Sequence, residues 1–425
     1  MAGIKTDRIF RLIVPVTICF WATALHAQTK IVTDSPFIEN TTVVIAGAEF
    51  RRSALHNIFW GKHYRKEWNT PVRVPNLYLD SLGLKPITES GSRQSKGLRL
   101  KAADGKQYVL RSVNKDFGQA FPENFQGTFI THIAKDQASI SLPFSALTIT
   151  PMIGPTGIYH TTPMIAFVPQ QPALGKYNAR YGDQLYLFEE RPDDNEKTVE
   201  NFGNSKKVIG SDKLMEHLYE DNDNSVDQYA FAKARLFDML IGDWGRHPDN
   251  WRWAKFEYGK RNVFRPIPRD RDQAYTIFDG FWPWIATNIF GAIQLESFDR
   301  DLNNVKRFNK PGRVLDDRFT NELTREDWIR AAHELQSVVT DDVIAAGVRR
   351  LPGPIYESAG HFIEASLRSR RDHLERYAVD YYKNLTHHVQ LVGTDKRELF
   401  ELNRNGKGEL RVNVYKIDKH GAAKS

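Results

Sequence analysis

Residues 226–242 constrain the fold most, because their pattern predicts a helix that is buried on nearly every side. Its apolar positions recur at steps of four, four, three and four: Val226, Ala230, Ala234, Phe237 and Ile241. This spacing places them on one face of a helix. The last turn is apolar on its other faces as well, through Leu236, Met239 and Leu240. We therefore expect a core helix that ends at Gly242.

A polar loop follows this helix. Within eight residues it presents five side chains with charges or hydrogen-bonding groups: Asp243, Arg246, His247, Asp249 and Asn250. They are interleaved with Trp244 and followed by Trp251. Charged groups beside so much aromatic surface need partners, because burying an unpaired charge is costly. The loop is therefore either a functional site or an ion-paired part of the core.

Two short predicted strands lead from this loop to a second acidic segment, PIPRDRDQAY, at 266–275. Asp270 and Asp272 are two residues apart, which in an extended segment puts both carboxylates on one side and Arg271 on the other. Two carboxylates on one face suit Mg²⁺ or Mn²⁺, and Asn250 is a further oxygen ligand. The alternative is a solvated or ion-paired face that holds no metal.

The order of these motifs points to a family. The chain reads helix, G-D-W-x-R-H-x-x-N, strand, strand, P-x-D-x-D-x-x-Y. This order resembles the catalytic core of the atypical protein kinases of the spore-coat CotH type, and more distantly the secretory-pathway kinases. The resemblance implies that His247 belongs to the catalytic loop, that Asn250 contacts the metal–nucleotide, and that Asp270 and Asp272 hold the metal.

The catalytic base departs from this family pattern. The resemblance places the base directly before the Arg-His pair, where this chain has Gly245. Either Asp243, our provisional base, or Asp249 substitutes for it, or the chain is a degenerate kinase. Loss of a general base costs about 10²–10⁴ in rate, but phosphoryl transfer depends mainly on positioning and charge stabilisation, so some activity survives such a loss.

A second set of candidate residues lies at 89–115. Strands at 97–102 and 107–113 flank Asp104-Gly105, a strong hairpin signal, and a polar loop with Gly91, Ser92 and Ser95 precedes them. In kinase-like folds such a loop and hairpin cover the nucleotide phosphates, and a strand cation pairs with them. The candidate cations are Arg111 and Lys115. The alternative is an ordinary charged hairpin.

The segment after the hairpin predicts a helix at 122–138, in which Asp136 would be the acidic partner of the strand cation. Stretches 144–150 and 157–169 are rich in β-formers, and 184–191 predicts a strand that leads to the second lobe.

The N-terminal residues 1–27 resemble a secretory signal, with Lys5, Arg8 and Arg11 before an apolar run and a small residue, Ala27, at the cleavage position. Cys19 lies in this run and is the only cysteine, so the mature chain has no disulfide, no thiol chemistry and no cysteine-based zinc site. Loss of three basic and one acidic residue from +7 leaves a net charge of about +5, too small to argue for nucleic acid.

The sequence thus predicts an α+β protein with a two-lobed, protein-kinase-like core, a C-terminal helical subdomain and a short terminal β segment. The expected parts are an irregular aromatic and basic segment at 28–88, a β-rich small lobe at 89–191, a polar linker or insertion at 192–225, a helical large lobe with the site loop at 226–386, and strands with a polar tail at 387–425. Helices are expected near 323–349, capped by Thr324 and Asp327, and near 357–384.

A wider resemblance covers most of the mature length, including KGLRLKAADGKQYVLRSVNKD, IYHTTPMIAFVPQ and IGDWGRHPDNWRW. These motifs resemble the soluble region of large exported Bacteroidetes proteins that carry a C-terminal outer-membrane surface-antigen barrel. The resemblance implies a periplasmic or outer-membrane-associated protein, with membrane association only through a partner. No barrel strands follow here, so we expect a stand-alone or truncated form.

Two functions follow from this sequence. The first is transfer of a phosphoryl or nucleotidyl group from ATP, with Mg²⁺ or Mn²⁺, to a hydroxyl of a protein substrate. The second is a non-catalytic scaffold, or pseudokinase, for surface-protein assembly or export, with the barrel as partner. A hydrolase is disfavoured, because the chain has no G-x-S-x-G motif and no clustered histidines.

Overall fold

The computed structural model describes residues 38–91, 96–120, 126–288, 296–406, 410–418 and 420–424. Helices and strands are both abundant in these ranges, which confirms the predicted α+β class. The predicted signal sequence, residues 1–27, lies outside the described residues, as do Ser92 and Ser95 of the predicted phosphate loop. Within the described ranges, no helix has the length and hydropathy needed to cross a bilayer.

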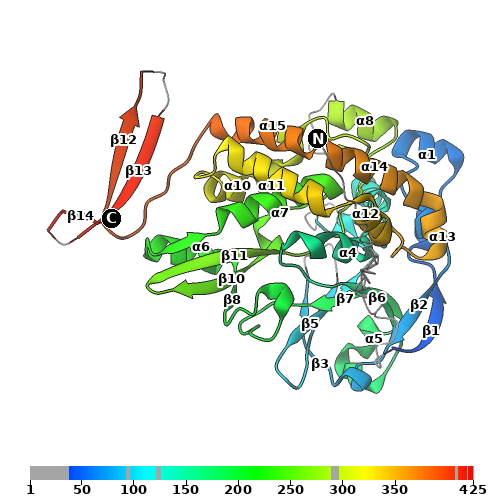
Figure 1. Ribbon diagram of the computed structural model, residues 1–425. Helices are drawn as coiled ribbons and strands as arrows, with labels where there is room; N and C mark the ends of the chain where they lie inside the picture. The colour runs from blue at the N-terminus through cyan, green and yellow to red at the C-terminus, as the bar shows by residue number, and fades with distance from the viewer. Residues whose placement is uncertain are drawn as a thin grey trace, which may run out of the picture. The chain divides into compact units, whose positions relative to one another are not determined.

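A seven-stranded sheet forms the first part of the fold, in the order β1-β2-β6-β7-β5-β4-β3 (Figure 1). Neighbouring strands are antiparallel except β2 and β6, which are parallel. The strands are β1 (Ile38–Val44), β2 (Val72–Leu77), β3 (Lys85–Ser90), β4 (Gly97–Lys101), β5 (Gln107–Ser112), β6 (Met164–Val168) and β7 (Gln184–Glu190). The predicted strand at 184–191 is therefore confirmed as β7.

The described part of the segment 28–88, from Ile38 onward, is not irregular, so that prediction is wrong. It supplies β1, β2 and β3 together with the short helices α1 (Ala54–Trp60) and α2 (Arg65–Trp68). Pro75 lies inside β2, and a proline weakens a strand signal because it cannot donate to the ladder. The strand forms nevertheless, because its apolar side chains, among them Val72 and Val74, are buried in the core.

The hairpin predicted around Asp104-Gly105 is confirmed, with β4 and β5 in antiparallel register. Gly105 has φ of 92°, a conformation that glycine adopts without strain. One face of the hairpin is fully buried, through Leu98, Leu100 and Leu110. Because side chains alternate along a strand, Arg99 and Arg111 point to the opposite face.

The predicted core helix is α7 (Gln228–Ile241), and Gly242 ends it with φ of 68°. Asp227 caps its first turn by accepting a hydrogen bond from the amide of Ala230 at 3.0 Å. Its last six residues, 236–241, are completely buried, as predicted. Gly242 has no room for a side chain, since a Cβ there would lie 2.7 Å from the ring of Phe298.

A four-stranded sheet packs beside α7 in the order β8-β10-β11-β9. Its strands are β8 (Val208–Gly210), β9 (Asn224–Val226), β10 (Trp251–Tyr258) and β11 (Arg261–Pro268). Of the two alternatives for 192–225, the polar linker is therefore wrong, because β8, most of β9 and helix α6 (Ser211–Glu220) lie there. The composition of α6 is polar, but its apolar stripe buries Leu214 against the core.

Residues 144–150, predicted as β-rich, form a short 3₁₀ turn at Ser145–Thr148 and helix α4 (Ile149–Ile153), so that prediction is also wrong. The β-branched Thr148, Ile149 and Thr150 favour strands in isolation, but tertiary packing overrides propensity here. Gly347 of α12 (Asp341–Val348) permits this packing, since a Cβ at Gly347 would lie 2.8 Å from the carbonyl oxygen of Thr148.

The helical subdomain is present, with more breaks than the sequence indicates. Its capping box at Thr324 and Asp327 is confirmed. Each of the two predicted long helices is divided, the first at Val339-Thr340 and the second at His373. The remaining helices are α3 (Phe129–Asp136), α5 (Asn178–Tyr181), α8 (Phe281–Asn288), α9 (Val305–Phe308), α10 (Arg313–Phe319), α11 (Arg325–Val338), α13 (Gly353–Ile355), α14 (His361–Asp372) and α15 (Leu374–Thr386).

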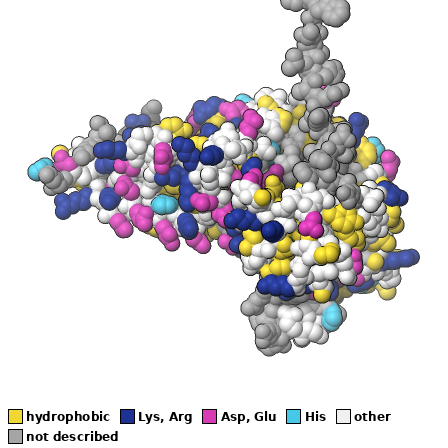
Figure 2. Space-filling view, turned by 90° about the horizontal axis from the view of Figure 1, so that it is seen from below, with side chains coloured by type: hydrophobic (Ala, Val, Ile, Leu, Met, Phe, Trp, Pro, Cys, Tyr) yellow, Lys and Arg dark blue, Asp and Glu magenta, His cyan; other side chains and the backbone are white. Residues whose placement is uncertain are grey.

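The predicted terminal strands are confirmed as an antiparallel sheet of β12 (Glu398–Arg404), β13 (Leu410–Ile417) and β14 (Ala423–Lys424). An ion pair between Lys416 and Asp223 joins this sheet to the segment before α7. On the face of the molecule shown in Figure 2, Lys and Arg side chains are interspersed with Asp and Glu side chains.

His63 ties the N-terminal segment to the core. Its Nδ1 lies 3.0 Å from Ser139 Oγ, and its amide donates to the Asp279 carboxylate at 3.0 Å. The ring is fully buried. Burial lowers the pKa of His63 to about 4, although Asp279 opposes the shift. The folded protein therefore holds this ring neutral.

The free energy of unfolding should fall as protons bind His63 in the unfolded chain. The pKa is 6.5 unfolded and about 4 folded, so the native state loses about 2 kcal/mol between pH 7 and pH 5. Urea unfolding of the wild type and of His63→Asn isolates this effect, since other groups titrate in both. The difference in the free energy of unfolding between the wild type and His63→Asn should be about 2 kcal/mol smaller at pH 5 than at pH 7. A difference that stays constant would show that His63 is not buried as neutral imidazole.

Candidate functional site

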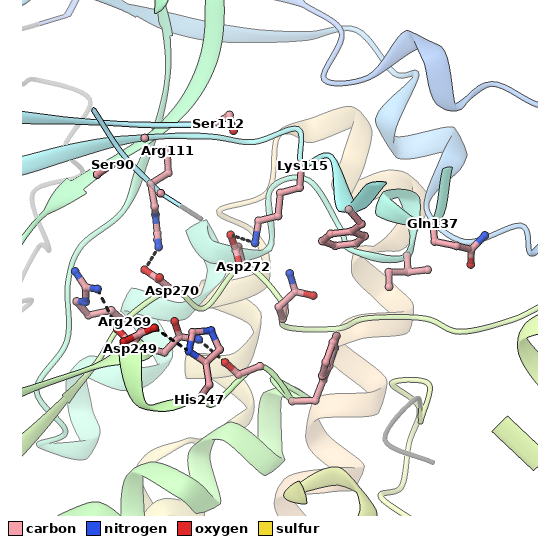
Figure 3. A pocket seen from close by; sticks show the side chains of 18 of the residues that line it. Ser90, Arg111, Ser112, Lys115, Gln137, His247, Asp249, Arg269, Asp270 and Asp272 are labelled. Atoms are coloured by element: carbon pink, nitrogen blue, oxygen red, sulfur yellow. Dashed lines mark hydrogen bonds and ion pairs between the residues drawn. The ribbon is translucent and has the colours of Figure 1, made fainter. Parts of the chain in front are cut away.

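A cavity of about 1140 Å³ lies between the exposed face of the β4–β5 hairpin and the loops that precede β10 and follow β11. The hairpin contributes Gly97, Arg99, Val109 and Arg111. The loops contribute predicted site residues and their neighbours, which are Gly245, His247, Asp249, Asn250, Arg269, Asp270 and Asp272. Two segments that are far apart in the sequence therefore meet at one site, as Figure 3 shows.

Cations and carboxylates face each other at the centre of this cavity. Arg111 contacts Asp270, and Lys115 Nζ lies 2.7 Å from Asp272 Oδ2 (Figure 3). Arg111 also forms a second ion pair, with Glu189 on β7, in which Arg111 Nη2 lies 2.6 Å from Glu189 Oε1. Burial raises the pKa of Asp272, but the charges of Lys115 and Arg111 outweigh it and leave that pKa below its ordinary value. Asp272 is thus held ionised.

The acidic segment has the side-chain directions that the sequence predicts, although it is not a strand. Asp270 has φ of 57°, in the left-handed region, and both aspartates line the cavity. Arg271 points the other way, into the core, where its Nη1 lies 3.0 Å from Asp238 Oδ1 and its guanidinium lies over Phe237. The two carboxylates therefore share one side, with the arginine on the opposite side.

A buried ion-pair network under the cavity holds this geometry. Arg246 is completely buried and binds Asp243 at 2.7 Å. Its guanidinium also donates to the backbone carbonyls of Arg269 at 2.7 Å and Asp270 at 2.9 Å. A further hydrogen bond runs from the amide of Arg269 to the carbonyl of Asn250 at 2.9 Å. One side chain thus joins the loop after α7 to the acidic segment.

Asp243, the provisional base of the sequence analysis, lies in this network and does not line the cavity. Its carboxylate is fully buried and accepts hydrogen bonds from Arg246 and from the amide of Gly245. Burial raises the pKa of Asp243, and Arg246 opposes the shift. The carboxylate is therefore occupied by structural partners.

His247 and Asp249 lie at the cavity, both largely exposed. Their side chains are 4.0 Å apart, measured from His247 Nδ1 to Asp249 Oδ2. Burial of the ring lowers the pKa of His247, although Asp249 opposes the shift. Of the two aspartates considered as a base, only Asp249 lines the cavity.

The oxygen donors of this site fit a hard divalent cation. Asp270 and Asp272 supply carboxylates, and the amide NH₂ of Asn250 donates to the carbonyl of Gly245, which leaves Asn250 Oδ1 as a ligand. Among the described residues, no group of three or more His, Cys, Asp or Glu side chains could hold a metal ion. A cation here would therefore complete its shell with water and phosphate oxygens, as Mg²⁺ usually does.

The predicted pairing of Asp136 with a strand cation is wrong. Asp136 binds Arg65 through two hydrogen bonds of 2.6 and 2.9 Å, and it also pairs with Arg52 and His56. Glu189 takes the predicted role, because β5 pairs with β7 and places Glu189 opposite Val109. That pairing joins strands that are not consecutive, so local sequence gives no signal for it.

Four arginines line one end of the cavity, and the sequence analysis assigned none of them to the site: Arg99, Arg191, Arg252 and Arg269. Burial and the charge of Arg252 lower the pKa of Arg269 to about 9. The pKa values of Arg99 and Arg252 are also lowered, by burial first and by Arg191 second. The end of the cavity is therefore strongly cationic.

No protein-family model and no curated protein matches the chain. Among solved structures, it is similar to the Helicobacter pylori proinflammatory kinase CtkA, with 11% identity over 72% of this chain and 97% of that one, and a TM-score of 0.36. The chain is also similar to a chain of the Shewanella oneidensis MR-1 toxin–antitoxin system HipA, HipB in complex with its operator DNA. The identity is 14% over 72% of this chain and 74% of that one, and the TM-score is 0.31.

The Rio2 kinase–ADP/Mg²⁺–phosphoaspartate complex of Chaetomium thermophilum has 10% identity over 68% of this chain and 71% of that one, with a TM-score of 0.28. TM-scores this low do not establish a shared topology. The geometry of the cavity therefore has to carry the functional assignment.

Replacing Arg246 should destabilise the protein strongly. Arg246→Met leaves the buried carboxylate of Asp243 without its cation, and breaking a buried pair in this way costs about 3–5 kcal/mol. Arg265→Met is the matched control, because Arg265 pairs with Asp227 at 2.8 Å near the surface, and such pairs are worth about 0–1 kcal/mol. Equal losses in the two variants, measured by urea unfolding, would contradict the role of Arg246.

Proposed function

We propose that the chain is an exported, atypical kinase-like protein that binds ATP with Mg²⁺ or Mn²⁺ in this cavity and transfers a phosphoryl or nucleotidyl group to a protein hydroxyl. One observation carries the proposal: Arg111 and Lys115 face Asp270 and Asp272 in the same open cavity. Phosphates need cations and a divalent metal needs carboxylates, so this set matches a metal–nucleotide.

The ion pairs across the cavity are consistent with a site that exchanges partners. When the nucleotide enters, Arg111 and Lys115 would turn to phosphate oxygens, and the carboxylates would turn to the metal. Glu189 would keep Arg111 in place during this exchange, since it holds the other guanidinium nitrogen at 2.6 Å. An Arg held by a carboxylate keeps its planar donor groups aligned for phosphate.

Asp249 is our candidate for the base, because Asp243 is occupied by Arg246. In the reaction, the acceptor oxygen forms a bond to the γ-phosphorus while the bond from that phosphorus to the bridging oxygen of ADP breaks. The proton of the acceptor hydroxyl passes to Asp249. Phosphoryl transfer depends mainly on positioning and charge, so an exposed base is sufficient.

The second candidate function is a non-catalytic scaffold for surface-protein assembly. Gly245 favours it, because it stands where the resemblance places the catalytic Asp, and the neighbouring Asp243 does not line the cavity. In either function we propose export through residues 1–27 and a periplasmic or outer-membrane-associated location, with a protein substrate or an outer-membrane barrel as the partner. The motifs at 96–116, 158–170 and 241–253 support that proposal.

Thermal or urea unfolding of residues 28–425 with ATP and Mg²⁺ or Mn²⁺ tests the nucleotide site. At about a hundred times its dissociation constant, the ligand should add about 2.7 kcal/mol to the free energy of unfolding. Asp270→Ala and Asp272→Ala should each abolish the metal-dependent part of this gain. No gain at millimolar nucleotide would rule out the enzyme and leave the scaffold.

The base is tested by loss and rescue. Asp249→Asn should lower the rate of phosphate transfer from γ-labelled ATP by about 10²–10⁴ without weakening nucleotide binding. Gly245→Asp in the same protein should restore activity, because the nearest contact of a Cβ at Gly245 is the flexible Gln273, at 3.2 Å, and Asp243 Oδ1 lies at an ordinary van der Waals distance of 3.5 Å. An unchanged rate in Asp249→Asn would exclude Asp249 as the base.

A further inference from the structure

Four arginines gather at the end of the cavity beyond Arg111. Arg99 lies on β4, Arg191 follows β7, Arg252 lies on β10, and Arg269 follows β11. Both sheets therefore supply two guanidinium groups to the same end. On β10, the flanking Trp251 and Trp253 are completely buried in the core, so the alternation of the strand turns Arg252 toward the cavity.

Three of these arginines have no carboxylate partner within ion-pair distance among the described residues. Arg252 Nη1 donates to the carbonyl of Trp251 at 3.0 Å, and Arg269 Nη2 donates to the carbonyl of Asp249 at 3.3 Å. For Arg99, the described part of the chain provides neither a carboxylate nor a hydrogen-bond acceptor. Only Arg191 is paired, with Asp193 at 2.5 Å.

The described residues that line the cavity include six cations and only three carboxylates. Two of these carboxylates, Asp270 and Asp272, already face Arg111 and Lys115 at the centre. The excess positive charge therefore lies at the arginine end. Like charges in a partly desolvated pocket repel each other. A bound anion would reduce this repulsion among the arginines.

We propose that the arginine end of the cavity is a second anion subsite, which binds an oligophosphate group separate from the phosphates held by Arg111 and Lys115. Three unpaired guanidinium groups suit a ligand of high charge density, because each phosphate carries up to two negative charges and three acceptor oxygens. A single carboxylate would satisfy only one of them. The subsite does not depend on the proposed phosphoryl transfer and needs no metal.

Isothermal titration of the full chain with sodium tripolyphosphate, in EDTA and low salt, tests the subsite. The wild type should bind one equivalent in a saturable way. The triple variant Arg99→Gln, Arg252→Gln, Arg269→Gln should bind on the order of 10²-fold more weakly or not at all. A matched control removes the same charge from exposed arginines outside the cavity, namely Arg73→Gln, Arg261→Gln, Arg350→Gln, and should change affinity by less than about threefold.

The outcomes distinguish the subsite from general charge attraction and from the nucleotide position. Equal weakening in both triple variants would mean non-specific attraction and overturn the proposal. Loss of binding in Arg111→Gln with retention in the cavity triple variant would place the tripolyphosphate at the nucleotide position and also overturn it. Citrate that binds as tightly as tripolyphosphate would reject the phosphate class.

Two further measurements show whether these arginines are structural and whether the subsite is separate from Asp270 and Asp272. The free energy of unfolding of the cavity triple variant should not fall, because mutual repulsion is removed, and a large loss would show that these arginines are structural. The double variant Asp270→Ala, Asp272→Ala should retain metal-free tripolyphosphate binding even if metal–nucleotide binding fails. Loss of tripolyphosphate binding in that variant would contradict a separate subsite.

Discussion

The geometry of the cavity depends on the buried side chain of Arg246. It binds Asp243 at 2.7 Å and holds the carbonyls of Arg269 and Asp270 with its guanidinium nitrogen atoms. These bonds cross from the loop after α7 to the segment after β11, so they tie the segment that leads into β10 to the segment that leaves β11. The desolvation of such a network is costly and is offset only if every charge finds a partner. The network thereby fixes the backbone of the acidic segment, so that Asp270 and Asp272 point into the cavity.

Above this network the cavity is arranged differently, because its charges are only partly matched. Arg111 and Lys115 pair with the aspartates across an open space, while three cations at the arginine end have no carboxylate partner among the described residues. A protein that needed this region only for stability would gain more from apolar packing than from exposed pairs and repelling arginines. The charges of the network below are ion-paired, whereas those of the cavity above are only partly matched, and this contrast supports the proposal that the cavity binds ligands.

Local signals in the sequence predicted much of this structure. The buried helix that ends at Gly242, the hairpin at Asp104-Gly105 and the capping box at Thr324 each depend on a few adjacent residues. Asp270 and Asp272 lie on the side that their spacing predicts, although the segment is not the extended one that the prediction assumed. Glu189 could not be predicted as the partner of Arg111, because only the pairing of β5 with β7 brings them together. The same holds for the four arginines, which come from four separate elements, and Asp136 was assigned wrongly because its partner Arg65 lies 71 residues earlier.

The proximity of the two anion sites has an energetic consequence. Burial and the charge of Arg252 lower the pKa of Arg269 most, and Arg111 lowers it further, so the centre and the arginine end share one electrostatic environment. Two anions bound side by side would repel each other, and by linkage each would weaken the other by the same factor. A divalent cation held by Asp270 and Asp272 would cancel part of the charge of a nucleotide and reduce this repulsion. The two aspartates would then control how well both sites fill together, in addition to holding the metal.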